Sequence, residues 1–145
     1  MKMRNAFFIA VIGLTVYVQF FQKRNPIQES QVEKIEINPQ LGQICKATTA
    51  MVFGRDYKLI MLDSIDTDGI AYVHYNRPSD NSNWAIKCKL EGNRVLWASN
   101  NPDNTGRWRN HPADEVITYN ISGTKLKLKQ VYTDGSNEDA IYDIK

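Results

Sequence analysis

The chain has 145 residues and a formal net charge of +2, and its 42% hydrophobic and 23% charged residues are typical of a folded protein. Lys2, Arg4, Lys23 and Arg24 carry four of the 18 positive charges, so residues 25–145 hold 14 basic side chains against all 16 acidic ones. Because phosphate neutralisation supplies most nucleic-acid affinity, this balance argues against nucleic-acid binding as the main role.

The first 24 residues differ in kind from the rest of the chain. An apolar run over residues 6–21 lies between two basic pairs, and its 16 residues are near the short limit for a membrane-spanning helix. A cleaved secretory signal is the alternative, but small residues at a cleavage site after the run are missing. We therefore expect residues 1–24 to be an uncleaved single-pass anchor that contacts the membrane through residues 6–21.

A polar segment over residues 25–40, with a proline near each end, predicts a linker. At its end, Asn38 and Pro39 predict a helix start, with Asn38 as the N-cap and Pro39 at the first helical position. Apolar residues follow at helical spacing as far as Val52, and Gly54 is a suitable C-cap. The folded domain is expected to span residues 41–145.

Seven runs rich in β-branched and aromatic residues follow, separated by turn sequences that contain Gly, Asn and Asp. The runs are residues 57–65, 70–77, 83–90, 94–99, 115–121, 125–132 and 139–144. Most connections are short, so neighbouring strands are expected to be antiparallel. The predicted fold class is α+β and mainly β, with one N-terminal helix packed on a curved antiparallel meander sheet or small barrel of about seven strands. This architecture resembles that of small periplasmic β-barrel modules such as lysozyme inhibitors, although no shared motif accompanies the resemblance.

Two cysteines are present, Cys45 on the predicted helix and Cys88 on the apolar face of a predicted strand. An even pair fits one disulfide in an oxidising compartment, and two buried free thiols are the alternative. We predict a Cys45–Cys88 disulfide that joins the helix to the sheet. Together with the anchor, it places the folded domain on the extracytoplasmic side of the cytoplasmic membrane, which is the periplasm in a Gram-negative bacterium.

The longest connection, residues 100–114, contains the candidate site. Trp108 lies between two arginines, a combination that suits a carboxylate, a sugar ring or a protein hot spot. In a meander, successive connections alternate between the two ends of the sheet, so a connection and the next but one lie at the same end. The polar stretch that begins at residue 76 is therefore expected to lie close to the connection over residues 100–114. The predicted binding residues are Arg77, Asp80, Arg107, Trp108, Arg109, His111 and Asp114.

Two other interpretations of this connection remain open. In the first, the stretch is a structural corner in which Trp108 caps the core while the arginines pair with Asp114 and Glu115. In the second, His111 and Asp114 are catalytic, but the sequence singles out no nucleophile and we predict no catalytic residue. If Trp108 faces the core, alternation along the chain leaves both arginines facing outward. No cofactor motif is present, and the two histidines are far apart in sequence, so neither a cofactor nor a metal site is predicted.

The sequence thus predicts a membrane-tethered, extracytoplasmic module that binds a protein partner in the cell envelope, such as an inhibitor, an immunity factor or an accessory subunit of an envelope complex. One alternative is a small hydrolase or lyase with its site around His111 and Asp114. The other is a structural subunit of a membrane complex that uses its anchor helix as the interface.

Overall fold

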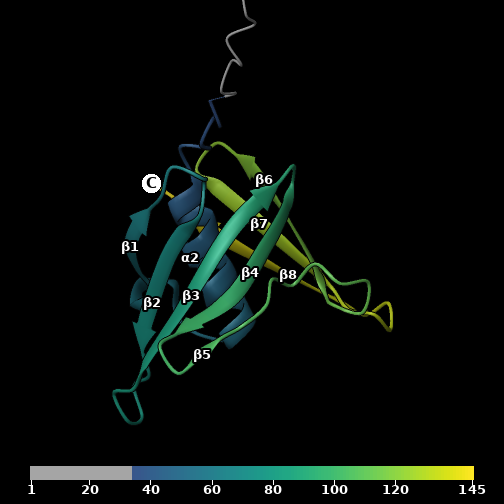
Figure 1. Ribbon diagram of the computed structural model, residues 1–145. Coiled ribbons are helices and arrows are strands. Elements are labelled where there is room, and N and C mark those ends of the chain that lie inside the picture. The colour runs from purple at the N-terminus through teal and green to yellow at the C-terminus, as the bar shows by residue number, and fades with distance from the viewer. Residues whose placement is uncertain (1–33) are drawn as a thin grey trace, which may run out of the picture. The chain divides into compact units, whose positions relative to one another are not determined.

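One α-helix and eight strands follow one another along residues 34–145, the part of the chain that the computed structural model describes (Figure 1). The helices are α2, Leu41–Phe53, and a short 3-10 helix η1, Tyr57–Leu59. The strands are β1 Met61–Ile65, β2 Ala71–Asn76, β3 Asn83–Glu91, β4 Arg94–Asn101, β5 Asn104–Thr105, β6 Val116–Ser122, β7 Lys125–Val131 and β8 Asn137–Asp143.

The predicted anchor, residues 1–24, lies outside the described residues, as does most of the predicted linker. Among residues 34–145, no helix is both long and apolar enough to cross a membrane.

All neighbouring strands are antiparallel, in the order β1-β2-β3-β4-β6-β7-β8, so the mainly β meander is confirmed. The sheet curves around α2 but does not close, because β1 and β8 end the order without pairing with each other (Figure 1). The barrel alternative is therefore wrong. The two-residue strand β5 was not predicted. It forms a short hairpin with the end of β4, and two residues are too few to show a strand pattern in the sequence.

Helix α2 begins two residues later than the sequence predicts. Its N-cap position is Gln40, which makes no side-chain cap, whereas Asn38 accepts a hydrogen bond from the Gln40 N–H at 2.8 Å and so closes a turn before the helix. The predicted end is confirmed, because Gly54 follows Phe53 with a φ of 61° and donates its N–H to carbonyls of the last turn.

Most of the circumference of α2 is buried, including two polar side chains. Thr48 and Thr49 donate their hydroxyls to the carbonyls of Ile44 and Cys45, each at 2.8 Å, so neither hydroxyl is left unpaired in the core. This local pairing explains how a helix that contains a Thr-Thr pair can lie inside a curved sheet.

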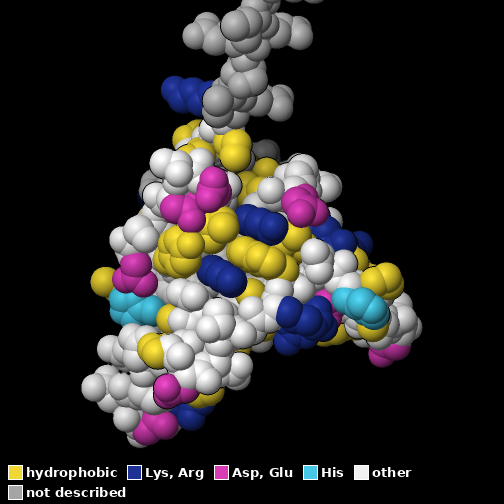
Figure 2. Space-filling model, in the orientation of Figure 1, with side chains coloured by type: hydrophobic (Ala, Val, Ile, Leu, Met, Phe, Trp, Pro, Cys, Tyr) yellow, Lys and Arg dark blue, Asp and Glu magenta, His cyan; other side chains and the backbone are white. Residues whose placement is uncertain are grey.

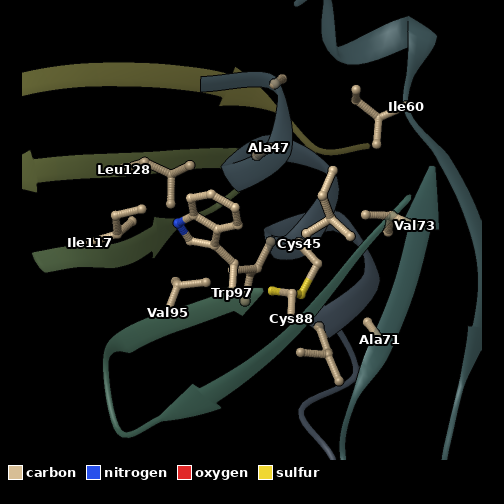
Figure 3. Close-up of a cluster of buried hydrophobic side chains, with 14 of the residues drawn as sticks. Cys45, Ala47, Ile60, Ala71, Val73, Cys88, Val95, Trp97, Ile117 and Leu128 are labelled. Carbon is tan, nitrogen blue, oxygen red and sulfur yellow. A yellow bond between two sulfur atoms is a disulfide. The ribbon is translucent and has the colours of Figure 1, made fainter. Parts of the chain in front are cut away.

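The core lies between α2 and the concave face of the sheet (Figure 3). The Cys45–Cys88 disulfide is present, as predicted, and it joins the helix to the middle of β3. The ring of Trp97 lies among Ala47, Ile117 and Leu128 in this core, and its side chain is only 7% exposed.

Strands β4 and β6 are joined by a very short stretch of pairing, in which Arg94 lies opposite Thr118 and Val95 opposite Ile117. Beyond these two pairs, the long connection replaces β6 as the neighbour of β4. The N–H groups of Gly106 and Arg109 donate to the carbonyls of Ser99 and Trp97, both at 3.0 Å. A Cβ at position 106 would lie 3.1 Å from the Ser99 backbone nitrogen, which is tighter than ordinary van der Waals contact, so glycine suits this close approach. The arrangement fixes residues 106–109 against the edge of β4.

Candidate functional site

A cleft of about 400 Å³ opens at the C-terminal end of α2, where the helix no longer covers the concave face of the sheet. Its apolar wall consists of Phe53 from α2, Trp84 from β3 and Trp97 from β4. The rings of Phe53 and Trp97 meet edge to face, with centroids 5.4 Å apart. Both indole N–H groups are already paired, that of Trp84 with the Ser82 hydroxyl at 2.8 Å and that of Trp97 with Glu115 at 3.1 Å.

Two arginines, Arg107 and Arg109, also line the cleft. Arg107 donates two hydrogen bonds to Asp114, at 2.6 and 2.7 Å, in a bidentate ion pair. The side chain of Asp114 is only 4% exposed and also accepts the backbone N–H of His111 at 2.9 Å. Arg109 stacks on Trp97, 4.8 Å from the ring centroid, and its Nη1 lies 3.6 Å from Asp114 and 3.9 Å from Glu115.

The structure therefore contains the ion pairs of the structural corner, while both guanidinium groups still line the cleft. The arginines are fixed from behind by Asp114 and Glu115. Such groups can contact a ligand without paying further side-chain ordering entropy, because their positions are already set by the fold.

The hydrogen bonds from Arg107, the His111 backbone N–H and the charge of Arg109 together hold the pKa of Asp114 far below its usual range. A carboxyl group whose pKa is lowered by folding stabilises the folded state at pH values above its unfolded pKa, about 3.9. That stabilisation is lost as the pH falls below about 4. We expect the melting temperature of the full chain to fall on acidification over this window.

The Asp114→Asn variant should melt earlier than wild type at neutral pH and should lose less stability on acidification. The measurement is a series of thermal unfolding curves between about pH 2 and pH 7. Asp134→Asn is the matched comparison, because the pKa of Asp134 is lowered by hydrogen bonds from Ser136 within one exposed turn, with no ion pair within residues 34–145, so this variant should change the pH profile less than Asp114→Asn does. Parallel pH profiles for wild type and Asp114→Asn would contradict the assignment.

Trp108 lies on the opposite face of the sheet from the core. Its ring contacts the ammonium groups of Lys87 and Lys89, 5.0 and 4.6 Å from the ring centroid. These lysines alternate with Cys88, which faces α2, so they and Trp108 are on the convex face. Figure 2 shows hydrophobic side chains beside two basic ones in the middle of this face.

The interpretation in which Trp108 caps the core is therefore wrong, and the physical reason lies in β4. Leu96 and Ala98 point away from the core face of Val95 and Trp97, yet both are fully buried. An apolar surface on the convex side of β4 needs a cover, and Trp108 is placed to supply it. The expectation that the arginines and Trp108 point to opposite sides agrees with the geometry.

Of the polar stretch over residues 76–84, which was predicted to lie near the site, only Trp84 lines the cleft. Arg77 stacks on the Trp84 ring, 4.4 Å from its centroid, and pairs weakly with Asp80 at 3.4 Å. Asp80 is exposed and holds its own turn by accepting hydrogen bonds from Ser82. Neither Arg77 nor Asp80 lines the cleft.

His111 is exposed and lines a separate open hollow beside Pro112 and Arg107. Its Nδ1 accepts the backbone N–H of Ala113 at 3.0 Å, and the carboxylate of Asp114 is bound by Arg107. The imidazole and this carboxylate are thus not joined as an acid–base pair.

The sequence-based prediction missed the aromatic wall and the polar residues Ser99 and Asn104 of the cleft. One signal for the wall was available, because alternation with Cys88 and Val95 places Trp84 and Trp97 on the face toward α2. Within residues 34–145, no group of three His, Cys, Asp or Glu side chains is arranged to hold a metal ion. Comparisons of the chain with protein-family models, with curated proteins and with solved structures find no match.

Proposed function

We propose that this chain is a membrane-tethered, extracytoplasmic module that binds a protein partner of the cell envelope through the cleft beside α2. The observation that carries the proposal is an open cleft that is lined by aromatic rings and by two arginines, Arg107 in a bidentate ion pair and Arg109 over the Trp97 ring. Trp and Arg are the residue types that contribute most often to binding hot spots, above all where their positions are set before the partner arrives.

The location is supported by two features. The Cys45–Cys88 disulfide is of the kind that persists in oxidising compartments outside the cytoplasm. The apolar run over residues 6–21, with basic residues on both sides, has the composition of an anchor. A tethered domain of this kind meets its partners at or near the membrane surface.

The geometry favours binding over hydrolysis. A hydrolase around His111 would need its imidazole oriented by a carboxylate, whereas Nδ1 of His111 accepts a backbone N–H and Asp114 is paired with Arg107. The alternative of a structural subunit depends on residues 6–21, which lie outside the described residues.

Site-specific photo-cross-linking in membranes of the native host tests the proposal. A photoreactive benzoylphenylalanine in place of Asn104, an exposed residue on the cleft wall, should form a discrete adduct with one partner protein. The matched control is the same group at Asn120, which is exposed on β6 away from the cleft. Equal adducts from both positions, or none from Asn104 in a folded, expressed protein, would contradict binding through the cleft.

A further inference from the structure

We infer that the cleft binds a carboxylate side chain, supplied by an acidic segment of the partner. This inference rests on the proposed function, because it names the chemistry that the cleft recognises in a protein partner.

The first observation is that Arg109 has open hydrogen-bond donors. Its side chain is 40% exposed, makes no hydrogen bond within residues 34–145, and comes no closer than 3.6 Å to the carboxylate of Asp114. The carbon of its guanidinium group lies over the Trp97 ring, 4.8 Å from the ring centroid. Arg109 therefore presents a planar fork of N–H donors, the geometry that matches a carboxylate in a bidentate pair.

The second observation is that two further side chains on the cleft wall, Ser99 and Asn104, have donors to spare. Asn101 accepts the Ala85 N–H at 2.8 Å, and the Ser99 hydroxyl oxygen accepts the Asn101 amide at 3.2 Å. The hydroxyl hydrogen of Ser99 and the side-chain NH₂ of Asn104 have no acceptor among the described residues, so both can donate.

The free donors of Arg109, Ser99 and Asn104 suit a ligand group that accepts hydrogen bonds. A sugar hydroxyl both donates and accepts, whereas an ionised carboxylate only accepts. No Asp or Glu lines the cleft to repel it. Asp114 and Glu115 behind the arginines balance their charge, so the attraction acts through short-range hydrogen bonds rather than a broad positive field. An apolar neighbour of the acidic residue can pack against Trp84 and Phe53.

The three tryptophans of the chain provide a direct readout, because Trp84 and Trp97 line the cleft while Trp108 is on the other face of the sheet. The full chain is labelled with 5-fluorotryptophan, and its fluorine resonances are assigned by single Trp→Phe substitutions. The probe is the blocked tripeptide acetyl-Leu-Glu-Leu-amide. We expect it to shift the Trp84 and Trp97 resonances and to leave that of Trp108 in place.

Three further probes identify the source of the carboxylate. Acetyl-Leu-Gln-Leu-amide, which lacks a carboxylate, should shift neither cleft resonance. The same Gln peptide with a free C-terminal acid tests a chain end, and glucuronate tests a sugar acid. If either of these binds the cleft and the Glu peptide does not, an acidic side chain is the wrong source and the inference is overturned.

A matched pair of variants tests the site itself. Asn104→Asp places a carboxylate on the cleft wall and should weaken binding of the Glu peptide about tenfold or more, since it repels the carboxylate of the peptide and removes a hydrogen-bond donor. Asn120→Asp adds the same charge on β6 and should leave the affinity unchanged.

Equal binding by the Glu and Gln peptides, a shift confined to Trp108, no shift at all, or an unaffected Asn104→Asp variant would each overturn the inference. The proposed function would still stand if cross-linking from Asn104 captured a partner, so the two failures are distinguishable.

Discussion

Replacing Trp97 with alanine should unfold the domain or lower its free energy of unfolding by about 3–5 kcal/mol, the usual cost of truncating a buried aromatic side chain. Trp97 is 7% exposed and packs against Phe53 in the core. Its removal also leaves Glu115 without the indole N–H and Arg109 without the ring on which it stacks. Urea unfolding of the full chain measures the loss.

Trp108→Ala is the matched control for this experiment. Trp108 is half-buried on the convex face, between Lys87 and Lys89, and it covers only the outer side of β4. Its truncation should therefore cost clearly less than that of Trp97. If Trp108→Ala were as destabilising as Trp97→Ala, the expectation that Trp108 adds less to the stability of the domain would be contradicted.

Removal of the disulfide should have the second large effect. The double variant Cys45→Ala/Cys88→Ala is expected to lose about 2–5 kcal/mol of stability, as is typical when a native bridge is removed from a small domain. The bridge closes a chain segment with a sequence separation of 43 and is completely buried. The measurement is the midpoint of urea unfolding under oxidising conditions.

Reductant supplies the control for the disulfide experiment. It should lower the unfolding midpoint of the wild type toward that of the double variant and should leave the double variant unchanged. A wild-type midpoint that does not move after complete reduction would show that the bridge adds nothing to stability.

Much of the fold could be predicted because its signals are local. Strict alternation along β3 and β7 identifies strands with one apolar face, and glycine after Phe53 ends the helix in the left-handed conformation that L side chains rarely adopt. The disulfide was predictable for the same reason, since helical spacing and strand alternation placed both cysteines on apolar faces.

The features that the sequence did not predict depend on longer-range packing. Whether a curved sheet closes is decided by the distance between its first and last strands, which no local pattern reports. The position of Trp108 follows from β4, whose four successive buried residues, Val95–Ala98, show no alternation because both faces of the strand are covered. Such an unbroken apolar run is itself a signal that a second layer covers the outer face.

The roles of the arginines were ambiguous for a related reason. The sequence shows Arg107 and Arg109 a few residues before Asp114, but it does not show that the carboxylate of Asp114 is buried and needs partners. Burial decides this point, because an unpaired charge in the interior is far more costly than one in water. The same arginines can thus pair with a buried carboxylate that the fold requires and still present N–H donors to a ligand.

The short pairing between β4 and β6 has a consequence for how the domain opens. Two residue pairs and one further backbone hydrogen bond, from the Tyr119 N–H to the Asn93 carbonyl at 2.9 Å, join the ladder of β1–β4 to that of β6–β8. The disulfide ties α2 to the first ladder, while the second is attached through side-chain packing and the residues before β6. Local unfolding often follows such boundaries, so we expect the C-terminal ladder to be a cooperative unit of lower stability than the rest. Its amide hydrogens are expected to exchange with solvent through partial openings in which α2, β3 and β4, with the aromatic wall of the cleft, remain folded.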